Sequence, residues 1–377
     1  MKVTSYRELM DQQARAAVRI SGAHHSSWDG QLAETDPKRD VNGVARWDHT
    51  IEYNRARVVE PLEEMFQNAR HYSQDPKTLQ SYREALKTVL HENTHMLAGE
   101  GTQHAQAQQA FANKPGVKQV EESFTELYSQ QQLNAYIDDL GLEEIAPGIK
   151  QADAAMAYKR YVPAAETLAN SIARNSQGGL TSDEVVRRMA IVTADQKFRA
   201  AAEMIYDNSD LPGLMPPEQR AEAVRRIEAA MGPEFAKLEN VKSSDDAIRR
   251  RQSAVIGGRT ATAAYDVVED LRQQWGMPGP EQQVRRGVGA DRETTQANEQ
   301  ANGNGAHQGV DDPGQLSGPE EPARPDLPPE LAAAARVGLG NSAPLQSATR
   351  LAADQQGSRR TTATGPAQQR QGPETQR

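Results

Sequence analysis

The distribution of aromatic residues sets the first limit on what this 377-residue chain can fold into. Trp275 is the last aromatic residue, and residues 276–377 contain no Phe, Tyr or Trp. That segment is dominated by Gln, Gly, Pro, Ala, Arg and Thr, and such a composition cannot bury enough apolar surface to offset the entropy lost on ordering. We therefore predict a disordered low-complexity tail over residues 279–377. Within it, residues 329–337 have the composition of a short helix that forms on meeting a partner.

Charge and cysteine content narrow the classes of function. The net charge is -9, so no positive field extends over the chain to attract nucleic acid or an anionic membrane. The chain has no cysteine, which excludes disulfides and thiolate ligands, so a transition metal would have to be held by His, Asp or Glu. No apolar run resembles a signal peptide or a membrane span, and the expected location is cytoplasmic, with non-classical export as the alternative.

The spacing of apolar residues predicts a mainly α fold of the α+β class. The expected helices lie around Tyr6–Ile20 and at roughly 58–72, 77–98, 104–113, 117–139, 150–175, 182–207, 216–240 and 243–275. Residues 41–54, VNGVARWDHTIEYN, instead place apolar residues among polar ones after an Asn-Gly pair. This pattern predicts a β-hairpin or edge strand near the N-terminus.

The helix expected over residues 78–99 carries the pattern HExxH at His91, Glu92 and His95. At 100° per residue, the two histidines lie about 40° apart on one face, so both imidazoles can reach a single metal ion. They point away from the apolar stripe of the helix. Glu92 directly follows the first histidine, where its carboxylate could deprotonate a water rather than bind the metal. The pattern therefore suggests a zinc site.

A simpler reading of the same residues is a solvated helix face. With 8 histidines in the chain, an accidental HExxH has odds of roughly one in a hundred. The motif gains weight from its helical context and from a second helix at residues 117–130, VKQVEESFTELYSQ. There Glu122 and Glu126 share the face opposite the apolar stripe, although an ordinary acidic surface pair would look the same.

Together, HENTH and EESFTE resemble the gluzincin branch of the HExxH zinc metallopeptidases. The tract ESFTELY is similar to the E-G-[FL]-T-E-Y run of several bacterial members, with Ser123 in place of the usual glycine. The resemblance implies that Glu122 is the third zinc ligand and that Glu126 hydrogen-bonds His91. It covers about residues 40–175, less than half of the chain.

Other assignments of the third ligand fit the sequence less well. A metzincin would need a histidine six residues after His95, where the chain has Gly101, and His104 is out of register. Glu121 is the nearest competitor to Glu122, but it lies about 100° away on the helical wheel, closer to the apolar stripe.

The resemblance also implies a residue that stabilises the oxyanion. The tract AYKRYVPAAETLANSI, from Ala157, resembles the tyrosine-containing helix that follows the glutamate ligand in several related families. Tyr158 is then the expected catalytic residue with Tyr161 in reserve, although a partly buried structural helix tyrosine is the more common reading of both. The segment WDHTIEYN would supply an edge strand, with Trp47 and Tyr53 lining a substrate groove.

These observations divide the chain into a zincin-like domain (1–178), a helical extension (179–278) and the tail (279–377). The predicted function is zinc-dependent hydrolysis of peptide bonds, with Glu92 as general base and a peptide or protein as substrate. The alternative is a catalytically degenerate zincin-like scaffold. In either case the extension or the tail is a possible docking site for a protein partner.

Overall fold

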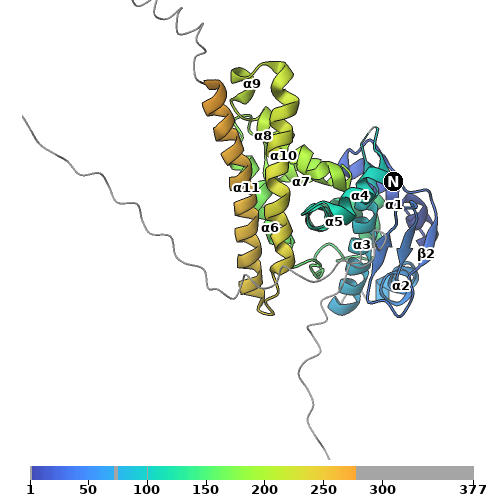
Figure 1. The fold of residues 1–377 in the computed structure, drawn as a ribbon. Helices are drawn as coiled ribbons and strands as arrows, with labels where there is room; N and C mark the ends of the chain where they lie inside the picture. The colour runs from blue at the N-terminus through green and yellow to red at the C-terminus, as the bar shows by residue number, and fades with distance from the viewer. Residues whose placement is uncertain (1, 72–74, 100, 277–377) are drawn as a thin grey trace, which may run out of the picture.

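A computed structural model describes residues 2–71, 75–99 and 101–276, and Figure 1 shows their arrangement. The predicted mainly helical fold with small N-terminal sheets is confirmed. The helices are α1 (Tyr6–Ser21), α2 (Glu60–Asn68), α3 (Pro76–His95), α4 (His104–Asn113), α5 (Val117–Leu140), α6 (Val162–Arg174), α7 (Ser182–Ala190), α8 (Lys197–Asp207), α9 (Leu211–Leu214), α10 (Arg220–Ala236) and α11 (Asp246–Gly276).

Two small sheets accompany the first helices. In the larger sheet the strand order is β2-β4-β3, with β2 (Leu32–Glu34) parallel and β3 (Gly43–Ala45) antiparallel to β4 (Ile51–Tyr53). The other sheet pairs β1 (His25–Ser26) with β5 (Leu97–Ala98), which begins directly after α3. The chain that follows α3 is thus held by the pairing of β5 with β1.

The hairpin predicted over residues 41–54 is present as β3 and β4, but the edge position was assigned to the wrong strand. β4 lies in the middle of its sheet, and β3 forms the edge. Tyr53 does not line a groove, because it is buried and its hydroxyl donates a hydrogen bond to Gln13. Trp47 packs edge-on against Phe111 of α4, with ring centroids 5.9 Å apart.

Local signals at both ends of α3 explain why the helix has these limits. The Asp75 side chain accepts a hydrogen bond from the Lys77 backbone N–H, and Pro76 occupies the first turn, where a missing N–H costs nothing. After His95 the chain leaves the helix at Met96 and enters β5. The His91 to His95 turn is therefore the last turn of α3, held in place by β5.

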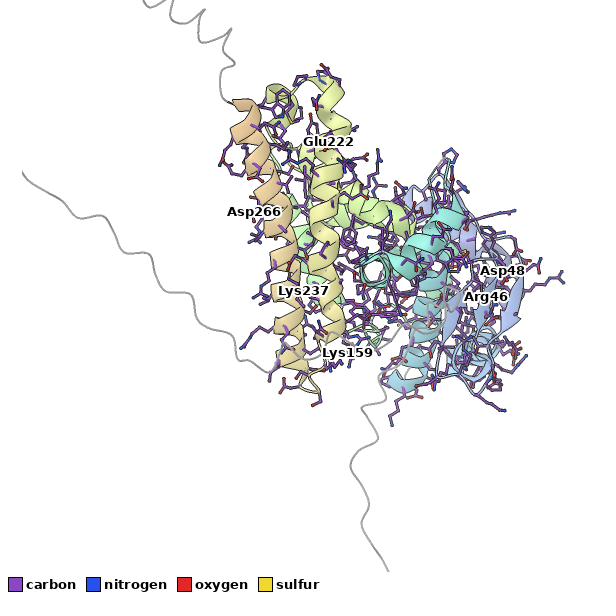
Figure 2. The ribbon with its side chains drawn as sticks, viewed as in Figure 1. Arg46, Asp48, Lys159, Glu222, Lys237 and Asp266 are labelled. Carbon is purple, nitrogen blue, oxygen red and sulfur yellow. The ribbon has the colours of Figure 1, made fainter. Side chains whose placement is uncertain are left out.

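Helix α5 is surrounded by protein on all sides over its first half. Every residue from Gln119 to Ser129 is buried, and side chains fill the space around this helix in Figure 2. It begins after Gly116, whose φ of 78° and close approach to the Gly232 carbonyl oxygen, 2.4 Å from a hypothetical Cβ, exclude other residues. Between Gln119 and Ser129, α5 thus runs through the interior and not along the surface.

Two hydrophobic cores meet on α5. Its second half packs with α1, α2 and α3 in an N-terminal core, through residues that include Leu133 and Tyr136. Its first half packs with α6, α7, α8, α10 and α11 in a C-terminal core, through residues that include Val120 and Phe124. In Figure 1, α5 lies between these two groups of elements. The domain boundary suggested at residue 178 stays a prediction.

The helix predicted over 150–175 is correct only in its second part. α6 begins at Val162, with Pro163 in its first turn, and residues 150–161 form turns and extended chain. Proline lacks an N–H and is tolerated in the first turn of a helix but not in its interior, which explains the late start. The predicted helix over 182–207 is divided into α7 and α8. The predicted tail, with its segment 329–337, lies outside the described residues. Among the residues described, no helix has the length and apolar character needed to span a bilayer.

Candidate metal centre

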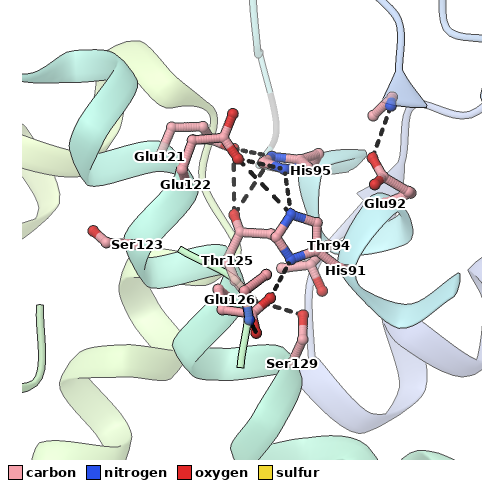
Figure 3. Close-up of polar contacts among 12 residues, drawn as sticks. His91, Glu92, Thr94, His95, Glu121, Glu122, Ser123, Thr125, Glu126 and Ser129 are labelled. Atoms are coloured by element: carbon pink, nitrogen blue, oxygen red, sulfur yellow. Dashed lines mark hydrogen bonds and ion pairs between the residues drawn. The ribbon is translucent and has the colours of Figure 1, made fainter. Parts of the chain in front are cut away.

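The site forms where α3 crosses α5. His91 and His95 lie on the last turn of α3, and Glu122 lies on the facing turn of α5. The Nε2 atoms of the two histidines are 3.1 Å apart, and Glu122 Oε2 lies 3.8 Å from His91 Nε2 and 3.5 Å from His95 Nε2 (Figure 3). Among the described residues, these three form the one group of His, Asp or Glu side chains close enough to share a metal ion.

The spacing of the donor atoms fits a shared metal ion. Ligand atoms at ordinary zinc distances in a tetrahedron are about 3.4 Å from one another, close to the separations found here. All three side chains are buried, and Glu122 Oε2 has no hydrogen-bond partner among the described residues. A buried carboxylate oxygen without a donor is costly, and a metal ion in the middle of the triad would satisfy it.

Glu126 holds His91 from the side opposite the triad. Its Oε2 lies 3.0 Å from His91 Nδ1, which directs Nε2 toward His95 and Glu122. Its Oε1 accepts hydrogen bonds from Lys87 Nζ at 2.7 Å, Gln130 Nε2 at 2.7 Å and the Ala157 backbone N–H at 2.9 Å. The contact between Glu126 and His91 that the resemblance implied is therefore present, within a network of four donors.

Glu121 does the same for His95, a contact that the sequence analysis missed. Glu121 Oε1 lies 2.6 Å from His95 Nδ1, and Oε2 lies 3.3 Å from the buried ammonium of Lys197 on α8. On the helical wheel, Glu121 is the nearest competitor of Glu122 for the metal. In the structure Glu121 instead contacts Nδ1 of His95, whereas Glu122 faces Nε2. α3 and α5 run in opposite directions where they cross. His91 therefore meets Glu126, and His95, four residues later, meets Glu121.

The buried charges around the site do not cancel. Four carboxylates are buried here, those of Glu92, Glu121, Glu122 and Glu126, against two buried ammonium groups, Lys87 and Lys197. With neutral imidazoles this leaves two negative charges inside the protein, which a divalent cation would balance.

Without a metal, protonation of the two histidines would balance the negative charge. Burial disfavours the imidazolium, but the contacts with Glu121 and Glu122 outweigh it and raise the pKa of His95 to about 10. The pKa of His91 is also raised, because contacts with Glu122 and Glu126 outweigh burial. In the same way, burial is overcome at Glu122, where the two histidines lower the pKa of the carboxyl to about 2.

Glu92 points to β3 rather than into the triad. Its Oε2 accepts a hydrogen bond from the Ala45 backbone N–H at 2.8 Å, on the edge strand of the larger sheet (Figure 3). A Cβ at Gly43 would lie 2.7 Å from Glu92 Cγ, so only glycine leaves room for this side chain. The structure thus brings the Glu92 carboxylate to the β3 side of α3, where it meets the Ala45 N–H.

Tyr158 lies over the triad, although not on a helix as predicted. Its ring stacks on His91 with centroids 5.7 Å apart and an angle of 6° between the planes. Its φ of 48° is unusual for a large side chain and marks a strained position in the 150–161 segment. Burial, and then the negative charges of Glu122 and Glu92, raise the pKa of Tyr158 well above its usual value. Tyr161, the reserve, is buried and its hydroxyl bonds to Glu239, away from the triad.

Comparison with known proteins found no family model, no curated protein and no solved structure that matches this chain. The assignment of the centre therefore depends on its own geometry.

Proposed function

We propose that the protein is a zinc-dependent peptidase in which His91, His95 and Glu122 bind the metal. The observation that carries the proposal is the convergence of their three ligand atoms, with the buried Glu122 Oε2 left without a donor. Two histidines and one glutamate leave one coordination position free, as in catalytic zinc sites, whereas structural zinc sites use four protein ligands.

A bound zinc ion would polarise the substrate carbonyl group and make a water molecule more acidic. Glu92 would accept a proton from the attacking water and transfer it to the leaving amine. This role requires the Glu92 carboxylate to turn from the Ala45 N–H toward the triad. The bond to Ala45 would then be the resting position of the base, from which substrate bound along β3 displaces it.

Tyr158 would donate a hydrogen bond to the developing oxyanion. Its raised pKa keeps the hydroxyl protonated at neutral pH, which is the form that can donate. The side chain is only partly exposed and covers the triad, so a substrate carbonyl that approaches the centre meets this hydroxyl. Peptide or protein substrates are proposed because β3 offers an edge for main-chain pairing beside Glu92.

Metal content and the Glu92→Gln variant test the proposal. Purified protein should contain about one zinc per chain, and Glu92→Gln should retain the zinc while losing peptide hydrolysis. Glu222→Gln, an exposed change on α10, is the matched control and should retain both. Folded wild-type protein that stays metal-free in zinc-containing buffer would contradict the proposal.

A second candidate is a zincin-like scaffold that binds zinc without turnover. The burial of the whole triad and the engagement of Glu92 by Ala45 favour it, because both would have to change for substrate to react. The extension and tail would then bind a protein partner. Stoichiometric zinc with no hydrolysis of a broad peptide library, and no effect of Glu92→Gln on that partner's binding, would select this candidate.

A further inference from the structure

Helix α8 buries a lysine beside the metal centre, in a region without any chemical motif. Lys197 is fully buried, and its Nζ donates to the carbonyl oxygens of Met189 at 2.7 Å and Val192 at 3.1 Å. An ammonium group has three N–H bonds, and the third side of this one faces Glu121 Oε2 at 3.3 Å. The backbone at the end of α7 therefore fixes the lysine in place, and its charge is directed at α5.

We propose that Lys197 is a positioning residue for His95 and acts through Glu121; the proposal rests on the zinc site proposed above. Lys197 fixes the Glu121 carboxylate, and Glu121 Oε1, 2.6 Å from His95 Nδ1, orients the imidazole so that Nε2 faces His91 and Glu122. The metal ligand His95 is thereby held by a chain of contacts that begins in the C-terminal core.

Glu121, which contacts His95, depends on Lys197 more than Glu126, which contacts His91, depends on any one of its donors. Glu126 receives four donors, whereas Glu121 has, apart from Lys197, one short contact to His95 and a long one of 3.5 Å from Thr125 Oγ1. A buried carboxylate with so few partners loses its position when its cation is removed. Lys197 is thus the group that keeps Glu121 in place.

The zinc affinity of the Lys197→Met variant distinguishes a role in positioning His95 from a direct effect of the lysine charge on the metal. By Coulomb's law alone, removing a cation beside a dication site should tighten zinc binding. A role through Glu121 predicts the opposite, because loss of an outer partner of a histidine ligand weakens metal binding by about 10–100-fold. Chelator competition on the full chain would measure the affinity. Arg199→Met, an exposed change two residues along the same helix, should leave it unchanged.

The double variant Glu121→Gln/Lys197→Met guards against misfolding of the single one. It removes a buried ion pair as a unit, which proteins often tolerate, and leaves an amide oxygen to accept from His95. We expect it to fold and to bind zinc about 10-fold more weakly than the wild type. The Co²⁺ absorption spectrum should also change in both variants, because the orientation of one ligand changes.

Each result decides between outcomes. Weaker zinc binding and an altered Co²⁺ spectrum in the double variant, with Arg199→Met unaffected, support the proposal. Wild-type or tighter zinc binding in Lys197→Met or in the double variant overturns it and leaves the zinc site itself intact. A wild-type chain that binds no zinc overturns both the site and the role of Lys197.

Discussion

The α3–α5 and α6–α11 contacts hold the molecule together by opposite means. Between α3 and α5 lie two histidines, the three carboxylates of Glu121, Glu122 and Glu126, and Lys87, all buried. Between α6 and α11 the backbones approach so closely that a Cβ on Gly257 would lie 2.3 Å from the Ala164 carbonyl oxygen. Ala165 of α6 and Ala261 and Ala264 of α11 are also buried.

The polar α3–α5 contact carries the candidate metal site, whereas the small-residue α6–α11 contact has only a structural role. The polar contact depends on partners for every charge and, by our proposal, on a metal ion, so its stability changes with solution conditions. The small-residue contact depends only on shape and is indifferent to metal. α11 packs against α6 and α10, and α10 in turn packs on α8, which carries Lys197. The apolar helices thus fix a charged group at the centre.

The largest expected effect comes from Glu126→Gln in the polar contact. The change leaves Lys87 buried without its carboxylate and replaces the acceptor of His91, so we expect the free energy of unfolding to fall by about 3–5 kcal/mol. Urea unfolding measures it. Glu234→Gln, which removes a partly exposed pair with Lys237 (labelled in Figure 2), should cost at most about 1 kcal/mol. Equal losses in the two variants would contradict the distinction.

Removal of zinc should destabilise the polar contact and spare the small-residue contact. At free zinc about 1,000 times its Kd, chelation should lower stability by about 4 kcal/mol. Amide hydrogen exchange should quicken in α3 and α5 and stay slow in α6 and α11. Glu122→Ala lacks a ligand and should not respond to the chelator. Uniform acceleration along the chain would mean that the two contacts are not energetically separate.

Gly257→Ala tests the small-residue contact. The added methyl group would meet backbone atoms of Ala164, which cannot move aside like a flexible side chain, so α6 and α11 must separate. We expect a loss of about 1–3 kcal/mol of stability, with zinc affinity unchanged. Thermal unfolding and chelator competition on one sample measure both. A variant as stable as the wild type would show that this contact is looser than the structure indicates.

The adjacent glycine should respond in the opposite direction. A Cβ on Gly258 would meet nothing within 4 Å, and the residue lies inside α11. Gly258→Ala should therefore stabilise the protein by about 0.5–1 kcal/mol, because alanine loses less backbone freedom on folding. The same thermal unfolding assay measures the gain. Destabilisation at both positions would point to an effect on the helix as a whole.

The sequence was informative where the signals were local. The one-turn spacing of His91 and His95 and the helical periodicity around them predicted the histidine pair, which is a relation within a single helix that periodicity describes well. Glu122 as the third member of the triad came from the resemblance of the tract after Val117 to a known family. Pro163, in the first turn of α6, was also visible, and it could have placed Tyr158 outside a helix.

Relations between distant segments could not be read in this way. The wheel argument assumed that α5 has one apolar face and one solvated face, whereas its first half is buried all round, so Glu121 had a partner on the side taken for core. Lys197 follows an unremarkable Asp-Gln pair, and nothing in its neighbours distinguishes it from a surface lysine. Its burial depends on how α7, α8 and α5 pack, which only the tertiary structure reveals.

The position of α5 between both cores also has a consequence for biosynthesis. Chains emerge from the ribosome N-terminus first, so HENTH and the acidic turn of α5 are made well before α8. We expect a nascent chain that ends before Lys197 to take up zinc poorly, and a chain that includes α8 to take it up readily. Ribosome-bound chains of increasing length, probed for zinc retention, would show whether metal loading waits for the C-terminal helices.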